Sequence, residues 1–345
     1  MTRLVDRIDR FQQRHRWLGF PIAVLYKFID DQGPYLAALI TYYGFLSLFP
    51  LLLLLASVLG FLLQGNPDLQ ADILNSTLRQ LPVIGNELGE ARGLRGSTGA
   101  VIVGGVVATY GALGVAQAVQ NAMNVAWAVP RHQRPNPIAA RVRSLLLIAT
   151  AGLAILATTV TSAIVSTAGD WGPELGRGTA ILATAATVIA NAAVFVLAFH
   201  VATARRPPWR DVLPGAITAA ILWQLLQLAG PAWAASTFKG SSDTYGVFAL
   251  VLGLLGWLFV AASGLVLCVE INVVRSKRLY PRALMTVFTD NVDLTSADRR
   301  TYTDAALAQR HKGFESVTVS FEERPPRSAA TDEKDEDQTL SGGSR

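Results

Sequence analysis

The chain has 345 residues, of which 51% are hydrophobic and only 16% are charged, and its formal net charge is +5. A soluble globular protein has about 25% charged residues. With a mean hydropathy of +0.35, the composition excludes an ordinary water-soluble enzyme and indicates a membrane protein. The single cysteine, Cys268, excludes an intrachain disulfide framework. The four histidines are far apart in sequence, so we expect neither a metal site nor a cofactor.

The first 33 residues contain no apolar run and carry six cations, which excludes a cleavable signal peptide. Apolar residues and one histidine recur here at spacings of three and four, with arginines on the opposite face. They are Leu4, Ile8, Phe11, His15, Leu18 and Ile22. This pattern predicts an amphipathic helix in residues 1–33 that lies on the anionic inner leaflet. The alternative is a solvated helix packed on the cytoplasmic loops.

Six apolar stretches are long enough to cross a hydrocarbon layer of about 30 Å, which requires about 20 helical residues. They lie near 35–63, 98–127, 144–168, 179–203, 212–235 and 245–274. The sequence therefore predicts an all-α membrane domain of six helices over residues 34–276. Pro50 cannot donate to the helical ladder, so we expect a kink or hinge there in the first span.

The lysines and arginines beside these spans are distributed unevenly. Seventeen lie in the N-terminal segment, the second and fourth loops and the exit from the sixth span, against five on the opposite side. Cationic loops stay on the cytoplasmic side of a membrane. We therefore expect a multi-pass membrane protein with both termini in the cytoplasm.

The composition changes beyond the sixth span, where Arg324-Pro325-Pro326-Arg327 is followed by an acidic run and a Ser/Gly-rich end. Such a segment lacks the apolar residues needed for a core. We expect residues 277–345 to form a cytoplasmic, mostly disordered tail.

The second and sixth spans each have a stripe of small residues, a pattern that allows close helix packing in membranes. The stripes are Ala100, Gly104, Ala108, Ala112 and Ala116 in the second span and Gly246, Ala249, Gly253 and Gly256 in the sixth. We expect these two helices to pack through their outer halves.

Polar residues are concentrated toward the inner halves of the spans, where they are costly unless they find partners or water. They include Tyr42, Tyr43, Asn121, Asn124, Gln224, Gln227 and Asn272. Their bias toward one leaflet suggests a polar cavity open to the cytoplasm. The alternative is that these groups only join helices, each contributing about 0.6 kcal/mol.

Glu270 is the only charged residue inside a predicted span before its end. An ionisable group in a membrane span is by default a functional hypothesis, here a proton site or a partner for a cation. Because it lies near the helix end, it could instead reach the interface and pair with a loop arginine such as Arg205 or Arg141. His200, at a similar predicted depth, is another possible partner.

Enzyme signatures are absent from the sequence. There is no phosphate-binding Gly-rich loop, no His-Glu-x-x-His and no Gly-x-Ser-x-Gly. Before the tail, acids that could hold Mg²⁺ are not clustered. The positive charge belongs to membrane loops rather than to an aromatic and basic surface, so we expect neither an enzyme nor a nucleic-acid partner.

Five ordered segments between about residues 25 and 275 resemble the signatures of the YihY/BrkB family of bacterial inner-membrane proteins. They are Tyr42-Tyr43-Gly44-Phe45-Leu46-Ser47-Leu48-Phe49-Pro50, Asn121 to Trp127, Trp209-Arg210-Asp211-Val212-Leu213-Pro214-Gly215-Ala216, Tyr245-Gly246 and Glu270-Ile271-Asn272. Cys268 departs from the pattern, since family members usually have Gly two residues before the Glu.

The resemblance implies a six-helix plasma-membrane protein associated with envelope integrity and virulence. The family also bears an old label of ribonuclease BN, which these residues do not support, since they supply no metal-binding acids. By family analogy we expect the protein to move or flip a lipid or other amphiphile. The substrate would bind among Tyr42, Tyr43, Asn121, Asn124, Gln224, Gln227, Glu270 and Asn272. The alternative is a non-transporting scaffold for envelope proteins.

Overall fold

The computed structural model describes residues 2–62, 98–169, 173–238, 243–289 and 292–322, and helices make up all of their regular secondary structure. The expectation of an all-α protein is confirmed. The helices are α1 (Thr2–Arg14), α2 (Arg16–Asp30), α3 (Gly33–Leu62), α6 (Thr98–Ala126), α7 (Pro137–Gly169), α8 (Pro173–Ala202), α9 (Trp209–Phe238), α10 (Asp243–Lys277) and α11 (Ser296–Ala308), with a short 3₁₀ turn at Arg131–Gln133.

Six long helices lie where the sequence predicts six spans, namely α3, α6, α7, α8, α9 and α10. Within the described residues, three stretches are long and apolar enough to cross a membrane: Ala185–Ala202, Trp209–Ser236 and Val251–Lys277. The other three long helices each include side chains outside the described part of the chain.

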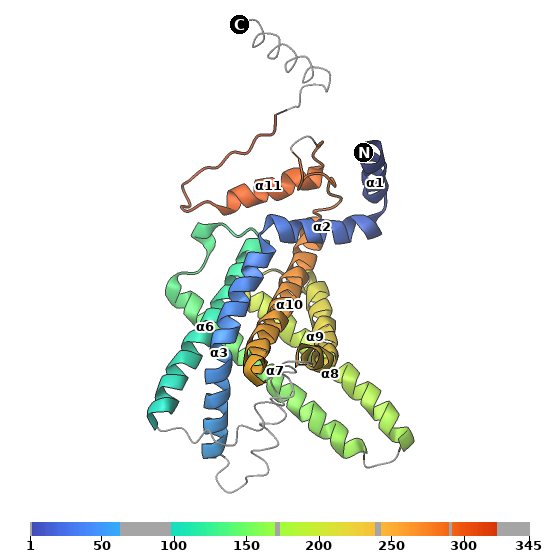
Figure 1. Ribbon diagram of the computed structural model, residues 1–345. Coiled ribbons are helices and arrows are strands. Elements are labelled where there is room, and N and C mark those ends of the chain that lie inside the picture. Colours follow the sequence, from blue (N-terminus) through green and yellow to red (C-terminus); the bar gives the residue numbers. More distant parts are fainter. Residues whose placement is uncertain (1, 63–97, 170–172, 239–242, 290–291, 323–345) are drawn as a thin grey trace, which may run out of the picture.

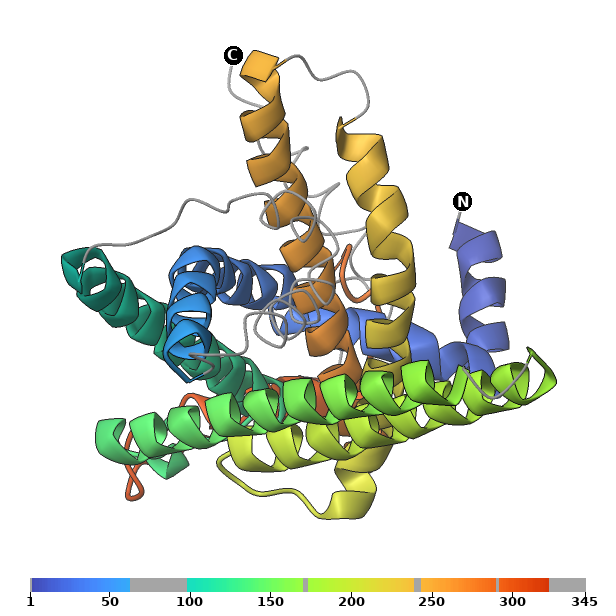
Figure 2. The ribbon, with the colours of Figure 1, turned by 90° about the horizontal axis from the view of Figure 1, so that it is seen from below.

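The long helices associate as consecutive pairs. α3 packs along α6, α7 along α8, and α9 along α10, and the view down the bundle in Figure 2 shows these pairs side by side. α10 also contacts α3 and α2, which places it at the centre of the bundle. Figure 1 shows α2 and α11 lying across one end of the bundle, which we call the α2 end.

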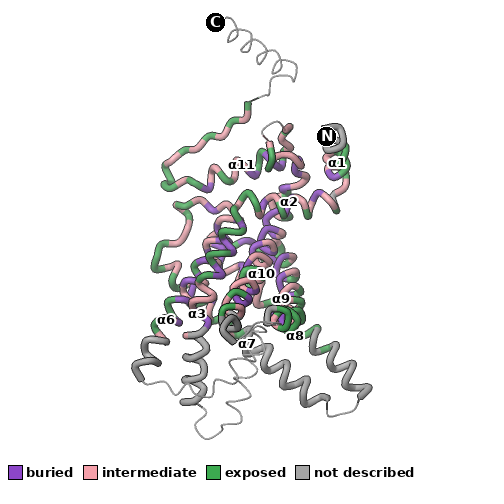
Figure 3. The backbone as a smooth tube through the Cα atoms, viewed as in Figure 1, coloured by how far each residue is buried: buried purple, intermediate pink, exposed green. Residues whose placement is uncertain are grey.

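The core of the described part is concentrated at the α2 end (Figure 3). Ala23 of α2, Met123 of α6, Phe199 of α8 and Val269 of α10 belong to one buried cluster there. The opposite ends of the long helices carry exposed apolar side chains such as Leu182 and Phe248. Exposed apolar residues on long helices are expected where lipid, not water, is the solvent.

The N-terminal segment forms two helices instead of the single amphipathic helix we expected. The break lies at His15, whose extended backbone, with φ −110° and ψ 100°, separates α1 from α2. On α1, Ile8 and Phe11 of the predicted apolar face are 50% and 52% exposed. α2 instead buries Ala23 and Val24 in the core.

Within the described residues, α6 and α10 do not show the expected pairing through their outer halves. Several positions of the two stripes, among them Ala100 and Gly246, have side-chain surroundings outside the described part. α6 packs mainly along α3, and a Cβ added to Gly111 or Gly114 would overlap Ser47 or Tyr43 of that helix. α6 and α10 meet closer to the α2 end, where Ala122 and Ala262 share a cluster. The small residues of α6 therefore permit close approach to α3.

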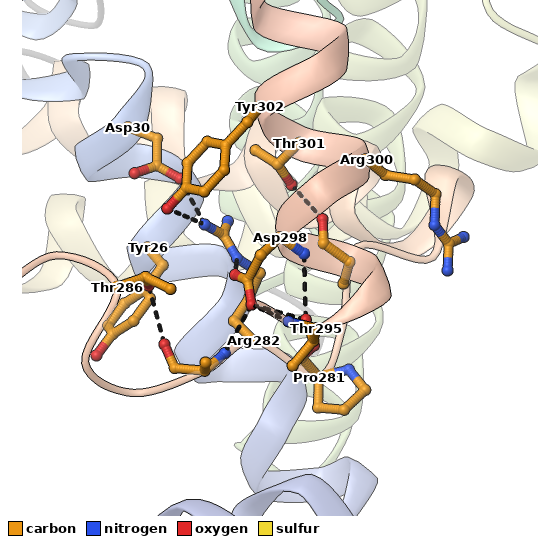
Figure 4. A network of polar contacts seen from close by, with 12 residues as sticks. Tyr26, Asp30, Pro281, Arg282, Thr286, Thr295, Asp298, Arg300, Thr301 and Tyr302 are labelled. Carbon is orange, nitrogen blue, oxygen red and sulfur yellow. Dashed lines mark hydrogen bonds and ion pairs between the residues drawn. The ribbon is translucent and has the colours of Figure 1, made fainter. Parts of the chain in front are cut away.

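Residues 292–322 differ from the disordered tail that we expected over 277–345. α11 starts with a capping box, in which Thr295 accepts from the backbone N–H of Asp298 and the Asp298 carboxylate accepts from the N–H of Thr295. Asp298 also binds Arg282, and both side chains are fully buried (Figure 4). This pairing fixes α11 on the chain that leaves α10. Residues 323–345 lie outside the described part.

Candidate functional site

A cluster of three charged side chains lies buried where α2, α6 and α10 meet. Glu270 of α10 is 0% exposed, and its Oε2 lies 3.8 Å from Nζ of Lys27 on α2. Lys27 also forms an ion pair with Asp31, which follows α2, and donates to the carbonyl oxygen of Ala126 in α6 at 3.2 Å. The Lys27 and Asp31 side chains are 3% and 8% exposed. The cluster therefore holds one cation and two carboxylates with almost no solvent.

The structure gives Glu270 a different partner from those suggested by the sequence. The Nδ1 of His200 lies 3.0 Å from the carbonyl oxygen of Pro207, and its ring stacks on Trp209 at a centroid distance of 4.6 Å. Among the ion pairs of the described residues, the partner of Glu270 is the ammonium of Lys27 in the N-terminal segment. No arginine pairs with Glu270 there.

Burial and the neighbouring charges shift the pKa values of Lys27 and Asp31, the two cluster residues outside the long helices. Burial raises the pKa of Asp31, and the Lys27 ammonium only partly opposes this effect. For Lys27, burial lowers the pKa, but the carboxylates of Glu270 and Asp31 together raise it by more. The pKa of Lys27 is therefore raised overall. Lys27 is therefore held in its charged form, whereas ionisation of Asp31 is disfavoured.

Three amides that we predicted to bind substrate form hydrogen bonds at helix junctions. Asn124 accepts from the backbone N–H of Ala204 at 2.9 Å, and Asn272 accepts from that of Gly215 at 2.6 Å. Asn121 accepts from Arg134 at 3.3 Å. These contacts join α6 to the α8–α9 loop, α10 to α9, and α6 to the α6–α7 loop, which matches the alternative that polar groups join helices.

The remaining predicted residues are spread over α3 and α9. Tyr42 is exposed, and Tyr43 packs edge-on against Tyr42 at 5.2 Å and Tyr110 at 6.5 Å. Gln224 and Gln227 are half-buried, and Oε1 of Gln224 has no hydrogen-bond partner among the described residues. None of the eight predicted residues is among those that line the cavity described below. Pro50 lies within α3, which continues to Leu62.

A partly enclosed cavity of about 220 Å³ lies between α3, α6, α8, α9 and α10, and its wall is almost entirely apolar. Its one hydroxyl group, that of Thr41, donates to the carbonyl oxygen of Ala37 at 2.8 Å. The lining residues are Ile40, Thr41, Gly44, Val115, Phe195, Ala219, Leu222, Trp223, Leu226, Leu258, Ala261, Ala262 and Leu265. An engineered cavity of about 150 Å³ with an apolar wall binds benzene, so this one has room for a larger hydrocarbon group.

The cavity and the charged cluster follow one another along the helices. On α10 the order is Glu270, then Val266, then the cavity residues Leu258 to Leu265; on the α2–α3 side it is Lys27, then Leu36 and Ala37, then Ile40. An apolar layer thus separates the charges from the cavity. This cavity is thus apolar, and the buried charge cluster lies apart from it.

Sequence reasoning missed Lys27, Asp31 and Arg282 as site residues. Lys27 and Arg282 were counted only as loop cations that set the orientation. A signal was available for Lys27, because it is flanked by Tyr26 and Phe28 in an apolar stretch. Within the described residues, no group of three or more His, Cys, Asp and Glu could hold a metal ion.

Comparison with known proteins identifies the family. The sequence model of the family described as Virulence factor BrkB matches residues 24–286, a range that includes Lys27, Glu270 and Arg282. The chain is also 24% identical over 264 residues to an uncharacterized protein of Dickeya dadantii (strain 3937), a match that covers 70% of this chain and 78% of that protein. No solved structure matches it. With apolar membrane-length helices and a match over most of its length, the chain belongs to the BrkB virulence factor family of integral membrane proteins.

Proposed function

We propose that this protein is a six-span plasma-membrane protein that binds the hydrocarbon chain of a lipid or other amphiphile in the cavity between α3, α9 and α10 and moves that molecule within the membrane. The observation that carries the proposal is the apolar wall of the 220 Å³ cavity. Such a wall offers few hydrogen bonds to a polar solute, but it matches a lipid chain.

The proposed orientation places the α2 end in the cytoplasm. Four cationic parts of the chain belong to this end, namely the N-terminal segment, the α6–α7 loop, the α8–α9 loop and the exit from α10. Ile8 and Phe11 of α1 are exposed, with arginines on the same helix. An anionic inner leaflet would accept both the apolar and the basic residues of α1.

The test fills the cavity without disturbing its walls. Gly44 lines the cavity, and a Cβ added there would meet no atom within 4 Å. Gly44→Leu should therefore occupy the space of the bound chain while the fold is kept. Gly152→Leu is the matched control, because Gly152 is also a helical glycine with no atom near the added Cβ and lies outside the cavity wall.

The assay uses purified protein in liposomes that contain a phospholipid with a photoreactive group in its acyl chain. In the native protein we expect crosslinks to α3, α9 and α10. Gly44→Leu should lose most of these crosslinks. Gly152→Leu should crosslink as the native protein does. The same liposomes, loaded with a fluorescent phospholipid, report movement between leaflets. Equal crosslinking of the native protein and Gly44→Leu would refute chain binding in this cavity.

A further inference from the structure

We propose that Lys27, Asp31 and Glu270 form a proton-binding site that holds one proton between its two carboxyl groups at neutral pH. The charges of the three side chains do not cancel when all of them are ionised. One ammonium and two carboxylates would leave a net charge of −1 in a site where the three side chains are 3%, 8% and 0% exposed. An isolated buried charge is strongly unfavourable, and a carboxyl group relieves it by taking up a proton.

Glu270 differs in its hydrogen bonding from Asp298, the other fully buried carboxylate of the described part. Asp298 accepts hydrogen bonds from Arg282, from the backbone N–H groups of Ala283 and Thr295, and from the Thr295 hydroxyl. Neither oxygen of Glu270 has a hydrogen-bond donor among the described residues. The Asp298 carboxylate is therefore amply hydrogen-bonded, whereas the carboxylate of Glu270 receives only the Lys27 charge at 3.8 Å.

The described helices around the cluster add no cation that would balance its second carboxylate. Neither α3 nor α6 has a charged residue anywhere in its sequence. The negative charge of Asp30 on α2 is felt at Lys27, but Asp30 is paired with Arg282 at 2.9 Å. Asp211 of α9 accepts a hydrogen bond from Ser276 at 2.8 Å. One proton shared by Asp31 and Glu270 therefore brings the cluster to neutrality.

The consequence is a contact between α2 and α10 that depends on protonation. With the proton bound, the cluster is neutral and holds the two helices together through Lys27. Without it, two carboxylates face each other in a low-dielectric site, where like charges repel strongly. The inference does not depend on lipid binding in the apolar cavity.

The test is infrared spectroscopy of the purified full-length protein in lipid nanodiscs, with pH as the variable. At pH 7 exposed carboxyl groups are ionised, so the carbonyl band of a protonated carboxyl group, identified by its shift in D₂O, reports only buried sites. We expect such a band in the native protein. It should be lost in Glu270→Gln and in Asp31→Asn, because each leaves one cation and one carboxylate and so needs no proton. Two separate substitutions keep the test valid if one variant does not fold.

Two further variants sharpen the result. In Lys27→Gln the cation is gone, so both carboxyl groups should be protonated and the band should grow to about twice its native area. Asp304→Asn is the control, because Asp304 pairs with Lys277 but is 35% exposed, and its band should equal that of the native protein. Absence of the band from native protein at pH 7, or its persistence in both single amide variants, would overturn the inference whatever the lipid assay shows.

Discussion

The backbone N–H of Gly215 donates to Oδ1 of Asn272 at 2.6 Å, and this hydrogen bond joins α9 to α10 at a point where the two helices approach closely. Both residues are buried. A Cβ at position 215 would overlap the carbonyl oxygen of Cys268 and the amide of Asn272. Glycine is required here because the α10 backbone occupies the space of a side chain.

Gly215→Ala should therefore separate α9 from α10 and lower the unfolding free energy by about 1–3 kcal/mol, the cost typical of overpacking. Thermal unfolding of the detergent-solubilised protein measures this effect. Gly256→Ala is the control, since an added Cβ would be in ordinary contact with Trp233 at 3.4 Å. Equal midpoints for the two variants would contradict the close approach at Gly215.

The second prediction concerns Arg282, which is fully buried and binds Asp30 of α2 at 2.9 Å and Asp298 of α11 (Figure 4). Arg282→Met leaves the buried Asp298 without its cation, which should cost about 3–5 kcal/mol. We expect residues 292–308 to exchange their amide hydrogens much faster in this variant. Arg300→Met is the control because Arg300 is exposed and its hydrogen bonds among the described residues go to Ser296 of the same helix. Unchanged exchange in Arg282→Met would show that α11 is held by other contacts.

The positions of the six long helices could be predicted because long apolar runs set them locally. The pairing of these helices could not, since small residues recur on several faces of α6 and only the three-dimensional packing shows that Gly111 and Gly114 meet α3. Glu270 was recognised from sequence because a charge in an apolar span is unusual. Its partner was missed because Lys27 lies more than 240 residues away and looks like a loop cation.

The ordered segment after α10 was missed for a related reason. Composition alone suggested disorder from about residue 277, but disorder arguments average over long windows. Thr295 followed by Asp298 has the spacing of a capping box, so a local signal for a helix start was present. The burial of Arg282 depends on Asp30 and Asp298 together, and no local pattern reveals such a contact.

The third prediction tests the membrane orientation. Cys268 is the only cysteine and is buried, so Cys268→Ala gives a background without reactive thiols. In that background, Gln133→Cys lies in the α6–α7 loop and Ser241→Cys between α9 and α10. We expect a membrane-impermeant maleimide to label Ser241→Cys in intact cells but Gln133→Cys only after permeabilisation. The opposite pattern would invert the proposed orientation.

The last prediction is the pH dependence of stability. Burial raises the pKa of Asp31, and the nearby Lys27 ammonium offsets only part of this increase. A group whose pKa is raised by folding binds its proton more tightly in the folded state. Its stabilising contribution is therefore complete below the unfolded value of about 3.9 and is lost as the pH rises through the folded value. The midpoint of thermal unfolding should thus fall with rising pH above about 4.

Asp31→Asn separates this effect from all other titrations in the chain. The amide resembles the protonated carboxyl group, so the variant should lose the part of the pH slope that Asp31 contributes and be more stable than the native protein at the alkaline end of the range. Asp304→Asn, at a partly exposed ion pair, should follow the native curve. If Asp31→Asn also follows the native curve at every pH, ionisation of Asp31 is not opposed by burial, and the charges between α2 and α10 are balanced without a bound proton.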